Sequence, residues 1–150
     1  MTPSRWHGCV LLAVLTAVAG CSKSPDEPPA RVKTGAEEVA QAFFEALANK
    51  DWPSAYQALD PQSTAKLREG QFAALAQQYY DSLGFEPTEV HVQSCDERGD
   101  EAVAHVNLKG LAGSSARFHK DAVALRRSAG KWRVVLPDYF GKPTATTRKS

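Results

Sequence analysis

Apolar residues recur at helical spacing along residues 36–47, which predicts an amphipathic helix. The stripe consists of Val39, Ala40, Phe43, Phe44 and Leu47. Residues three and four positions apart lie on one face of a helix, so this face is expected to be buried. Thr34 and Glu37 have the spacing of a capping box, in which both side chains bond free amides at a helix start. Residues 49–51 (Asn-Lys-Asp) end this helix.

Two further helices are predicted before residue 85. Asp51 caps a short helix with Pro53 in its first turn, where a missing N–H costs nothing. Its inward residues are expected to be Ala55, Tyr56 and Leu59. Asp60-Pro61 breaks this helix. A third helical stripe, closed by Gly84, contains Phe72, Leu75, Ala76, Tyr79 and Leu83.

From Pro87 onward the period of the apolar pattern changes to two, which is typical of strands. Four segments alternate in this way: residues 89–95, 102–111, 118–127 and 132–136. Residues 97–99 (Glu-Arg-Gly) and 129–130 (Ala-Gly) predict sharp turns between strands. Helices followed by antiparallel strands predict an α+β fold, with the N-terminal helices packed on one face of a sheet of about four strands.

The hydrophobic pattern also predicts how the first two strands pair. With Asp96 opposite Asp100, Val92 faces Ala104 and Val90 faces Val106 on the core side. The same register places His91 opposite His105 on the outer face. We expect these two imidazoles to be solvated side chains.

The last two strands are expected to pair around Ala129-Gly130. This register sets Leu125 opposite Val134 and Val123 opposite Leu136, so odd positions of the third strand face the helices. Continued outward, the alternation turns Asp121 and then His119 to the same face. The sequence leaves two readings open: a polar site that Tyr79 or Tyr80 approaches, or a frayed strand end with both groups in water.

The first 20 residues follow the pattern of an export signal. Arg5 precedes an uncharged apolar run, residues 9–19, which is too short to cross a bilayer comfortably as a helix. Residues 18–21 (Val-Ala-Gly-Cys) resemble the lipobox of bacterial lipoproteins. The resemblance implies cleavage before Cys21 and acylation of that cysteine. An ordinary signal peptide or a buried apolar helix is the alternative.

The length and composition of the chain predict a single domain after this signal. The chain has 150 residues, is 43% hydrophobic and carries a net charge of +1, which disfavours nucleic acid as a partner. Residues 21–34 are expected to be a lipidated cysteine and a flexible, proline-containing tether, residues 35–140 the domain, and residues 141–150 a disordered basic tail. Three cysteines are too few and too unevenly placed for a disulfide framework, and Cys95 is expected to be a small, partly buried hydrophobe.

The folded part resembles the nuclear transport factor 2-like superfamily. Residues 36–59 (AEEVAQAFFEALANKDWPSAYQAL) and 130–137 (GKWRVVLP) carry this resemblance, which covers roughly residues 35–137. It implies a curved sheet wrapped around the helices as a cone. The superfamily includes ketosteroid isomerase-like and SnoaL-like enzymes as well as small lipoproteins, so the resemblance implies a fold more than an activity.

Candidate site residues follow from this cone. Ketosteroid isomerases combine a carboxylate base with a tyrosine and a protonated aspartic acid, but that set has no residue-by-residue match here. The residues expected to line a pocket are Tyr79, Tyr80, His119, Asp121 and Trp132. The equally spaced His91, His105 and His119 fall on three different strands, and neither a metal nor a cofactor is expected.

Taken together, the sequence predicts a non-catalytic, lipid-anchored protein of the bacterial cell envelope. The membrane is its expected partner through Cys21, and a small apolar ligand or an envelope protein is expected to bind the domain. Ser22, directly after the lipidated cysteine, favours the periplasmic face of the outer membrane. A small lyase or isomerase acting in the cone, or a purely structural accessory subunit, is the alternative.

Overall fold

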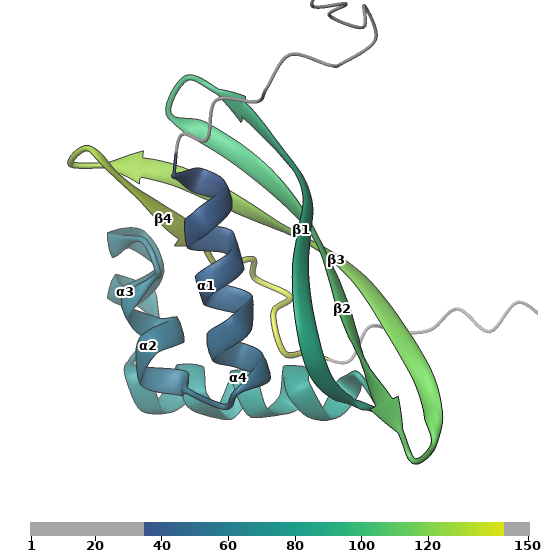
Figure 1. The fold of residues 1–150 in the computed structure, drawn as a ribbon. Helices are drawn as coiled ribbons and strands as arrows, with labels where there is room; N and C mark the ends of the chain where they lie inside the picture. Colours follow the sequence, from purple (N-terminus) through teal and green to yellow (C-terminus); the bar gives the residue numbers. More distant parts are fainter. Residues whose placement is uncertain (1–34, 143–150) are drawn as a thin grey trace, which may run out of the picture. The chain divides into compact units, whose positions relative to one another are not determined.

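The computed structural model describes residues 35–142. Within this part the helices come first: α1 (Ala36–Ala48), α2 (Trp52–Gln57), α3 (Pro61–Lys66) and α4 (Glu69–Ser82). The strands follow: β1 (Glu86–Arg98), β2 (Glu101–Ala112), β3 (Ser115–Ser128) and β4 (Lys131–Val135) (Figure 1). The predicted signal peptide (1–20), Cys21, the tether and residues 143–150 lie outside the described residues.

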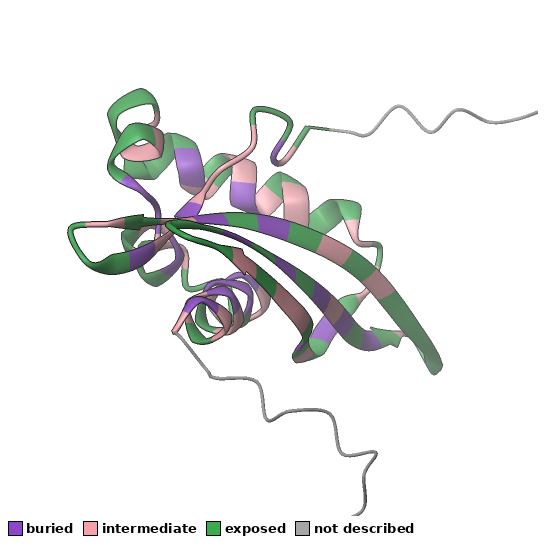
Figure 2. Ribbon diagram, turned by 90° about the horizontal axis from the view of Figure 1, so that it is seen from above, coloured by how far each residue is buried: buried purple, intermediate pink, exposed green. Residues whose placement is uncertain are grey.

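The strands form one antiparallel sheet in the order β1-β2-β3-β4, and the helices cover one of its faces (Figure 1). Figure 2 shows the sheet bending over the helices, with buried and exposed positions alternating along β2. Between the two layers lies a single hydrophobic core. This confirms the predicted α+β fold with helices packed on a curved antiparallel sheet. Among residues 35–142, no helix is long and apolar enough to cross a membrane.

Helix α1 supplies one wall of the core. It buries the expected apolar stripe, including Ala40, Phe43, Phe44 and Leu47. Its N-cap is Gly35, whose φ of 94° is accessible to glycine, and no side chain among residues 35–142 caps the helix. Thr34, the first member of the predicted capping box, lies outside the described residues. Burial of this apolar face stabilises α1 by tertiary packing.

The Asp60-Pro61 break is also the start of a helix that the pattern did not predict. The Asp60 carboxylate accepts a hydrogen bond from Ser63 N at 2.9 Å, and Pro61 occupies the first turn of α3. The side chain of Asp60 is only 2% exposed. The same residue pair thus follows α2 and begins α3. Aspartate is favoured at the N-cap of a helix, and proline is favoured in its first turn.

The register of β1 and β2 differs from the prediction. The strands meet in a two-residue turn with Arg98 opposite Glu101, and a bulge follows between Val92 and Ser94. Val92 therefore pairs with Val106, and His91 pairs with Asn107 instead of His105. Val90 likewise lies opposite Leu108 instead of Val106. Turn and bulge together shift the pairing by two positions at Val92, which keeps its side chain on the core face.

The pairing of β3 and β4 agrees with the prediction near the turn. Leu125 lies opposite Val134, and the turn residues Ala129 and Gly130 have φ of 49° and 75°. These positive values are those of the tight turns that join twisted antiparallel strands. The ladder ends at Val135, so the expected pair of Val123 and Leu136 does not form. Leu136 N instead donates to Ser63 Oγ at 3.1 Å, which draws the chain out of the sheet.

Both outer edges of the sheet are hydrogen-bonded to the helical layer. On β1, the Gln41 side-chain amide donates to Val90 O at 2.8 Å and accepts from Val92 N at 3.2 Å. On β4, Val134 N donates to Ala58 O at 2.9 Å, and Val134 O accepts from Asp60 N at 2.8 Å. These contacts fix the helices to the sheet at the two ends of the strand order.

Candidate functional site

A cavity of about 220 Å³ lies between α4, β3 and the segment that follows β4. We call it the α4–β3 cavity. Its polar lining includes Tyr79 on α4 and His119 and Asp121 on β3. The aromatic residues around it are Phe43, Phe44, Tyr79, Tyr139 and Phe140. Apolar walls with a few convergent polar groups are typical of small-molecule sites.

Tyr79 and Asp121 are joined directly inside this cavity. The Tyr79 hydroxyl donates to Asp121 Oδ2 at 2.8 Å, and Ala122 N donates to Asp121 Oδ1 at 2.7 Å. His119 Nε2 lies 4.0 Å from Asp121 Oδ2, and its ring meets the Tyr79 ring edge-on at 6.5 Å. The Asp121 side chain remains 28% exposed, so it can still be reached from the cavity.

Burial controls the protonation of Tyr79. Loss of solvent raises the pKa of its hydroxyl, and the Asp121 carboxylate raises this pKa further. A phenol in this position keeps its proton through the physiological range. Tyr79 is therefore a fixed hydrogen-bond donor to Asp121 and cannot act as a general base.

We expect stability to fall above about pH 9. In the folded state, burial is the main cause of the raised pKa values of Cys95, Tyr80 and Tyr79. In the unfolded state, thiols and phenols ionise near pH 8.5 and 10. The unfolded state then loses protons that the folded state retains, so the free energy of unfolding decreases as pH rises. Tyr79→Phe should make this decrease shallower above about pH 10. Denaturant unfolding at several pH values measures it, and equal slopes in both proteins would contradict the prediction.

Phe140 closes the inner side of the cavity. Its ring lies parallel to Phe72 at 5.9 Å and almost parallel to Tyr79 at 5.2 Å. The segment carrying it also passes so close to α4 that a Cβ on Gly141 would lie 2.4 Å from Leu75 O. On the other side of this segment is a second cavity of about 220 Å³, also lined by Phe140. Phe140 thus separates two cavities.

The segment after β4 is packed and hydrogen-bonded up to Lys142, the last described residue. Gly141 packs against α4, and Lys142 N donates to Tyr139 O at 3.0 Å. Both residues fall inside the stretch that the sequence assigned to a disordered tail. No apolar period marks this segment, so sequence patterning had no signal for its packing.

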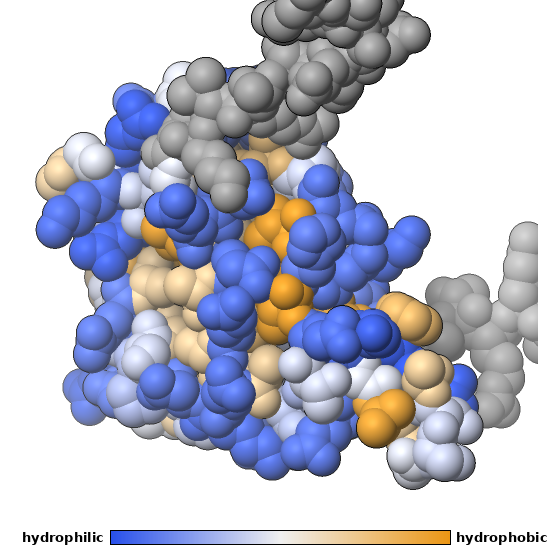
Figure 3. Space-filling model, viewed as in Figure 1, coloured by the Kyte–Doolittle hydropathy of each residue, from blue (hydrophilic) through white to orange (hydrophobic). Residues whose placement is uncertain are grey.

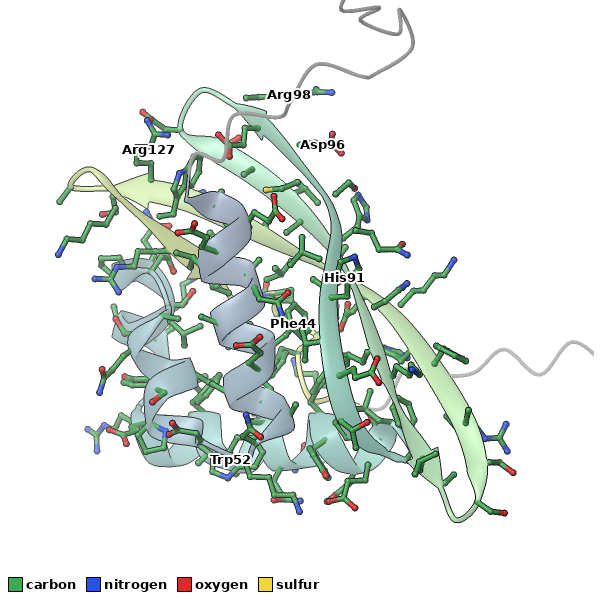
Figure 4. The ribbon with its side chains drawn as sticks, viewed as in Figure 1. Phe44, Trp52, His91, Asp96, Arg98 and Arg127 are labelled. Carbon is green, nitrogen blue, oxygen red and sulfur yellow. The ribbon has the colours of Figure 1, made fainter. Side chains whose placement is uncertain are left out.

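Two of the five predicted pocket residues lie elsewhere. Tyr80 follows Tyr79 on the helix and so points about 100° away from it, where Lys50 Nζ lies 4.4 Å from the centre of its ring. Trp132 is buried under the Arg127 guanidinium, 4.6 Å from the ring centre. Figure 4 places Arg127 near the end of the sheet where β4 begins, and Phe44 in the interior beside α1.

The remaining histidines do not join this site. His91 and His105 are exposed on β1 and β2, where they face Asn107 and Ser94 across the strands. Within residues 35–142 no group of three or more His, Cys, Asp or Glu side chains could hold a metal ion. The structure therefore brings together Tyr79, His119 and Asp121 from the candidate set. Tyr139 and Phe140 join them, and the sequence pattern had not singled these two out.

Comparisons with known proteins bear on the fold. No curated protein matches the sequence. Among solved structures, a SEC-C motif protein from Rhodopseudomonas palustris is similar, with a TM-score of 0.53 and 17% identity over 71% of this chain and 79% of the other. A putative NTF2-like transpeptidase from Campylobacter jejuni has a TM-score of 0.52 and 16% identity, covering 67% of this chain and 97% of the other. Identities this low are informative about the fold alone.

The sequence itself matches a protein family over most of the described domain. The match spans residues 35–134, from the start of α1 almost to the end of β4, and the family is described as the NTF2-like N-terminal transpeptidase domain. This agrees with the layered architecture and with the expected resemblance to nuclear transport factor 2-like proteins. The chain belongs to the family of NTF2-like N-terminal transpeptidase domains.

Proposed function

We propose that this chain is a lipid-anchored protein of the bacterial cell envelope that binds a small ligand, without catalysis, in the α4–β3 cavity. The observation that carries the proposal is the Tyr79–Asp121 hydrogen bond at 2.8 Å inside an aromatic-lined cavity. This pair provides a fixed, negatively charged anchor beside apolar walls. Such an arrangement selects a ligand by charge and shape.

The chemistry of the cavity favours an amphipathic ligand with a hydrogen-bond-donating or cationic head. Each Asp121 oxygen already accepts one hydrogen bond, and each has a further lone pair for a ligand donor. The rings of Phe44, Tyr139 and Phe140 would contact an apolar body. A volume of about 220 Å³ equals about seven water molecules, which limits the ligand to roughly one ring and a short arm.

The same hydrogen bond argues against catalysis. In an isomerase of the ketosteroid type, the base and the oxyanion donors face a substrate from different sides. Here the tyrosine hydroxyl donates to the carboxylate itself. The hydroxyl proton is therefore not free for a substrate, and one carboxylate oxygen already accepts a hydrogen bond. The raised pKa of Tyr79 also removes it as a base. The pair is therefore better suited to holding a ligand than to transforming one.

The ligand proposal can be tested with 2-phenylethylamine as the probe. In an NMR titration of the chain without residues 1–20, we expect saturable shifts at the backbone amides of Tyr79, Asp121 and Ala122. Asp121→Asn, which keeps an acceptor for Tyr79 but removes the charge, should weaken binding about tenfold. The matched control is Asp100→Asn, which removes a carboxylate that is 75% exposed at the β1–β2 turn. This variant should bind the probe normally. No shift in the wild type, or equal binding by Asp121→Asn, would overturn this ligand assignment.

The envelope location rests on the predicted lipobox around Cys21. One acyl chain holds a protein only marginally, at about 0.8 kcal/mol per buried methylene, whereas several chains hold it firmly. We expect mass spectrometry of the native N-terminus to show an acylated Cys21, and Cys21→Ser to abolish both acylation and membrane retention. An unmodified mature N-terminus would refute the anchoring.

A small lyase or isomerase acting in the same cavity is the alternative function. It is favoured by the 4.0 Å approach of His119 Nε2 to Asp121 Oδ2, since an imidazole beside a carboxylate can move protons. Incubation with cyclohexanone in deuterated water distinguishes the two functions. Deuterium uptake next to the carbonyl that is lost in His119→Ala and Asp121→Asn would favour the enzyme, and no uptake would favour binding.

A further inference from the structure

Charged residues of both signs line the α4–β3 cavity. Among the described residues of its lining, Asp121 is the only acidic one, whereas His119, Lys120 and Lys142 are basic. The proposed function uses the aspartate and the aromatic walls, and it leaves the lysines without a role. A ligand of this cavity therefore meets a positive charge as well as a negative one.

Strand position separates the two lysines. Lys120 is an even-numbered residue of β3 and lies opposite Asn107, so its side chain alternates to the outer face of the sheet. Lys142 belongs instead to the segment after β4, which packs against α4 on the helix side. Lys142 is therefore the lysine that can face a ligand in the cavity.

The backbone around Lys142 is fixed at the cavity. Gly141 lies directly against Leu75 O of α4, and Lys142 N donates to Tyr139 O at 3.0 Å. Within residues 35–142, the Lys142 ammonium group has no ion pair with a carboxylate. The segment thus presents a positive charge at the cavity that can pair with an anionic group of a ligand.

Apolar and charged groups are arranged differently inside the cavity and on the outer surface. Figure 3 shows the face that carries α1 and β1, where hydrophilic side chains cover most of the area and hydrophobic ones appear in small areas between them. In the α4–β3 cavity, aromatic rings form much of the wall and the charged groups are few. A ligand there must be apolar over most of its surface and carry charges only where the cavity matches them.

We propose that the ligand of the α4–β3 cavity is an α-amino acid with an apolar side chain, an inference that rests on the proposed ligand-binding function. The amino group donates to Asp121, the carboxylate pairs with Lys142, and the side chain contacts the aromatic walls. Tyr79 already donates to Asp121, so this aspartate is a fixed acceptor for the amino group. The amino group also separates the ligand carboxylate from Asp121.

A simple amine or a simple acid matches this lining less well. An amine pairs with Asp121 but leaves the charge of Lys142 unmatched, and an acid does the reverse. Because both residues line one cavity of about 220 Å³, the two charges of a ligand must lie close together. In an α-amino acid both charged groups are attached to one carbon atom, which meets this condition.

The test compares phenylalanine with 2-phenylethylamine, which differs from it only by lacking the carboxylate. The protein is the chain without residues 1–20, whose described part holds a complete core, and NMR titration measures the affinities. We expect phenylalanine to bind about fivefold more tightly, as one added ion pair at a partly exposed site allows. 3-Phenylpropionate, which lacks the amino group, should bind more weakly than phenylalanine and gain affinity in Asp121→Asn.

Three variants assign the gain to Lys142. Lys142→Gln should reduce the affinity for phenylalanine to that for 2-phenylethylamine. Lys142→Arg keeps the charge and should preserve most of the difference between the two probes. The matched control is Lys131→Gln, which removes an exposed lysine at the β3–β4 turn and should leave both affinities unchanged. Retained binding of 2-phenylethylamine verifies that each variant is folded.

The outcomes distinguish failure of this inference from failure of the proposed function. Binding of 2-phenylethylamine with no gain for phenylalanine overturns the amino-acid assignment and leaves the proposed function standing. An undiminished gain in Lys142→Gln also overturns it, because the carboxylate is then held elsewhere. Tighter binding of both probes by Lys142→Gln overturns it as well, since Lys142 would then neutralise Asp121. Absence of binding by all three probes overturns both this inference and the ligand assignment on which it rests.

Discussion

Replacing Phe140 with alanine is expected to lower the free energy of unfolding by roughly 3–5 kcal/mol. The side chain is 8% exposed and stacks between Phe72 and Tyr79. Its removal deletes these contacts and leaves a void that the neighbouring rings cannot fill without leaving their own positions. Urea or thermal unfolding measures the change. A loss below about 1 kcal/mol would show that the segment after β4 is not part of the core.

The neighbouring residue provides the control for this experiment. Tyr139 is 71% exposed, so Tyr139→Ala should change stability by no more than about 0.5 kcal/mol. Phe140→Ala should also join the two cavities of about 220 Å³ that lie on either side of the segment. An apolar void of this kind binds small rings, so indole is expected to stabilise the variant more than the wild type.

Gly110→Ala is expected to destabilise the fold by about 3 kcal/mol or more, because the added methyl group has no space. Gly110 pairs with Pro87 where β2 meets the start of β1, and a Cβ there would lie 1.8 Å from Glu86 O. The obstacle is backbone, which cannot rotate away as a side chain can. The beginning of β1 must therefore separate from β2. Hydrogen exchange at residues 86–92 should accelerate in the variant together with the loss of stability.

Gly70→Ala is the matched substitution without a steric obstacle. No atom lies within 4 Å of a Cβ at this position in α4, and alanine favours helix over glycine by up to about 1 kcal/mol. We expect a neutral or slightly stabilising change. If Gly110→Ala also proved neutral, the close approach of the Glu86 backbone to β2 would be wrong.

Periodicity in the sequence predicted the elements but not their exact pairing. Apolar spacing located α1, α4 and all the strands of the described domain, because burial on one face leaves a period of 3.6 or 2. The register of β1 depends instead on the turn at Gly99 and the bulge near Gln93. Both features depend on the backbone conformation of single residues, which the hydrophobic pattern does not predict. The faces were still predicted correctly, since the pairing shifted by an even number of positions at Val92.

The candidate site could be predicted only for residues that lie within a periodic apolar pattern. Counting by twos along β3 from Leu125 placed Asp121 and His119 on the helix side, and the helical stripe placed Tyr79 there as well. Phe140 comes from a segment with no period, so only the folded chain shows that it packs there. Trp132 was also assigned to the pocket, but the structure buries it under the Arg127 guanidinium instead.

The hydrogen bonds at the two outer strands have a consequence for the self-association of the domain. A free strand edge is a template on which another molecule can add a strand, which leads to aggregation. The Gln41 amide occupies this template at the middle of β1, and Ala58 and Asp60 occupy it at Val134 of β4. A neighbouring copy would have to break these bonds before it could extend the sheet. The domain can therefore reach high concentrations without strand exchange at these points.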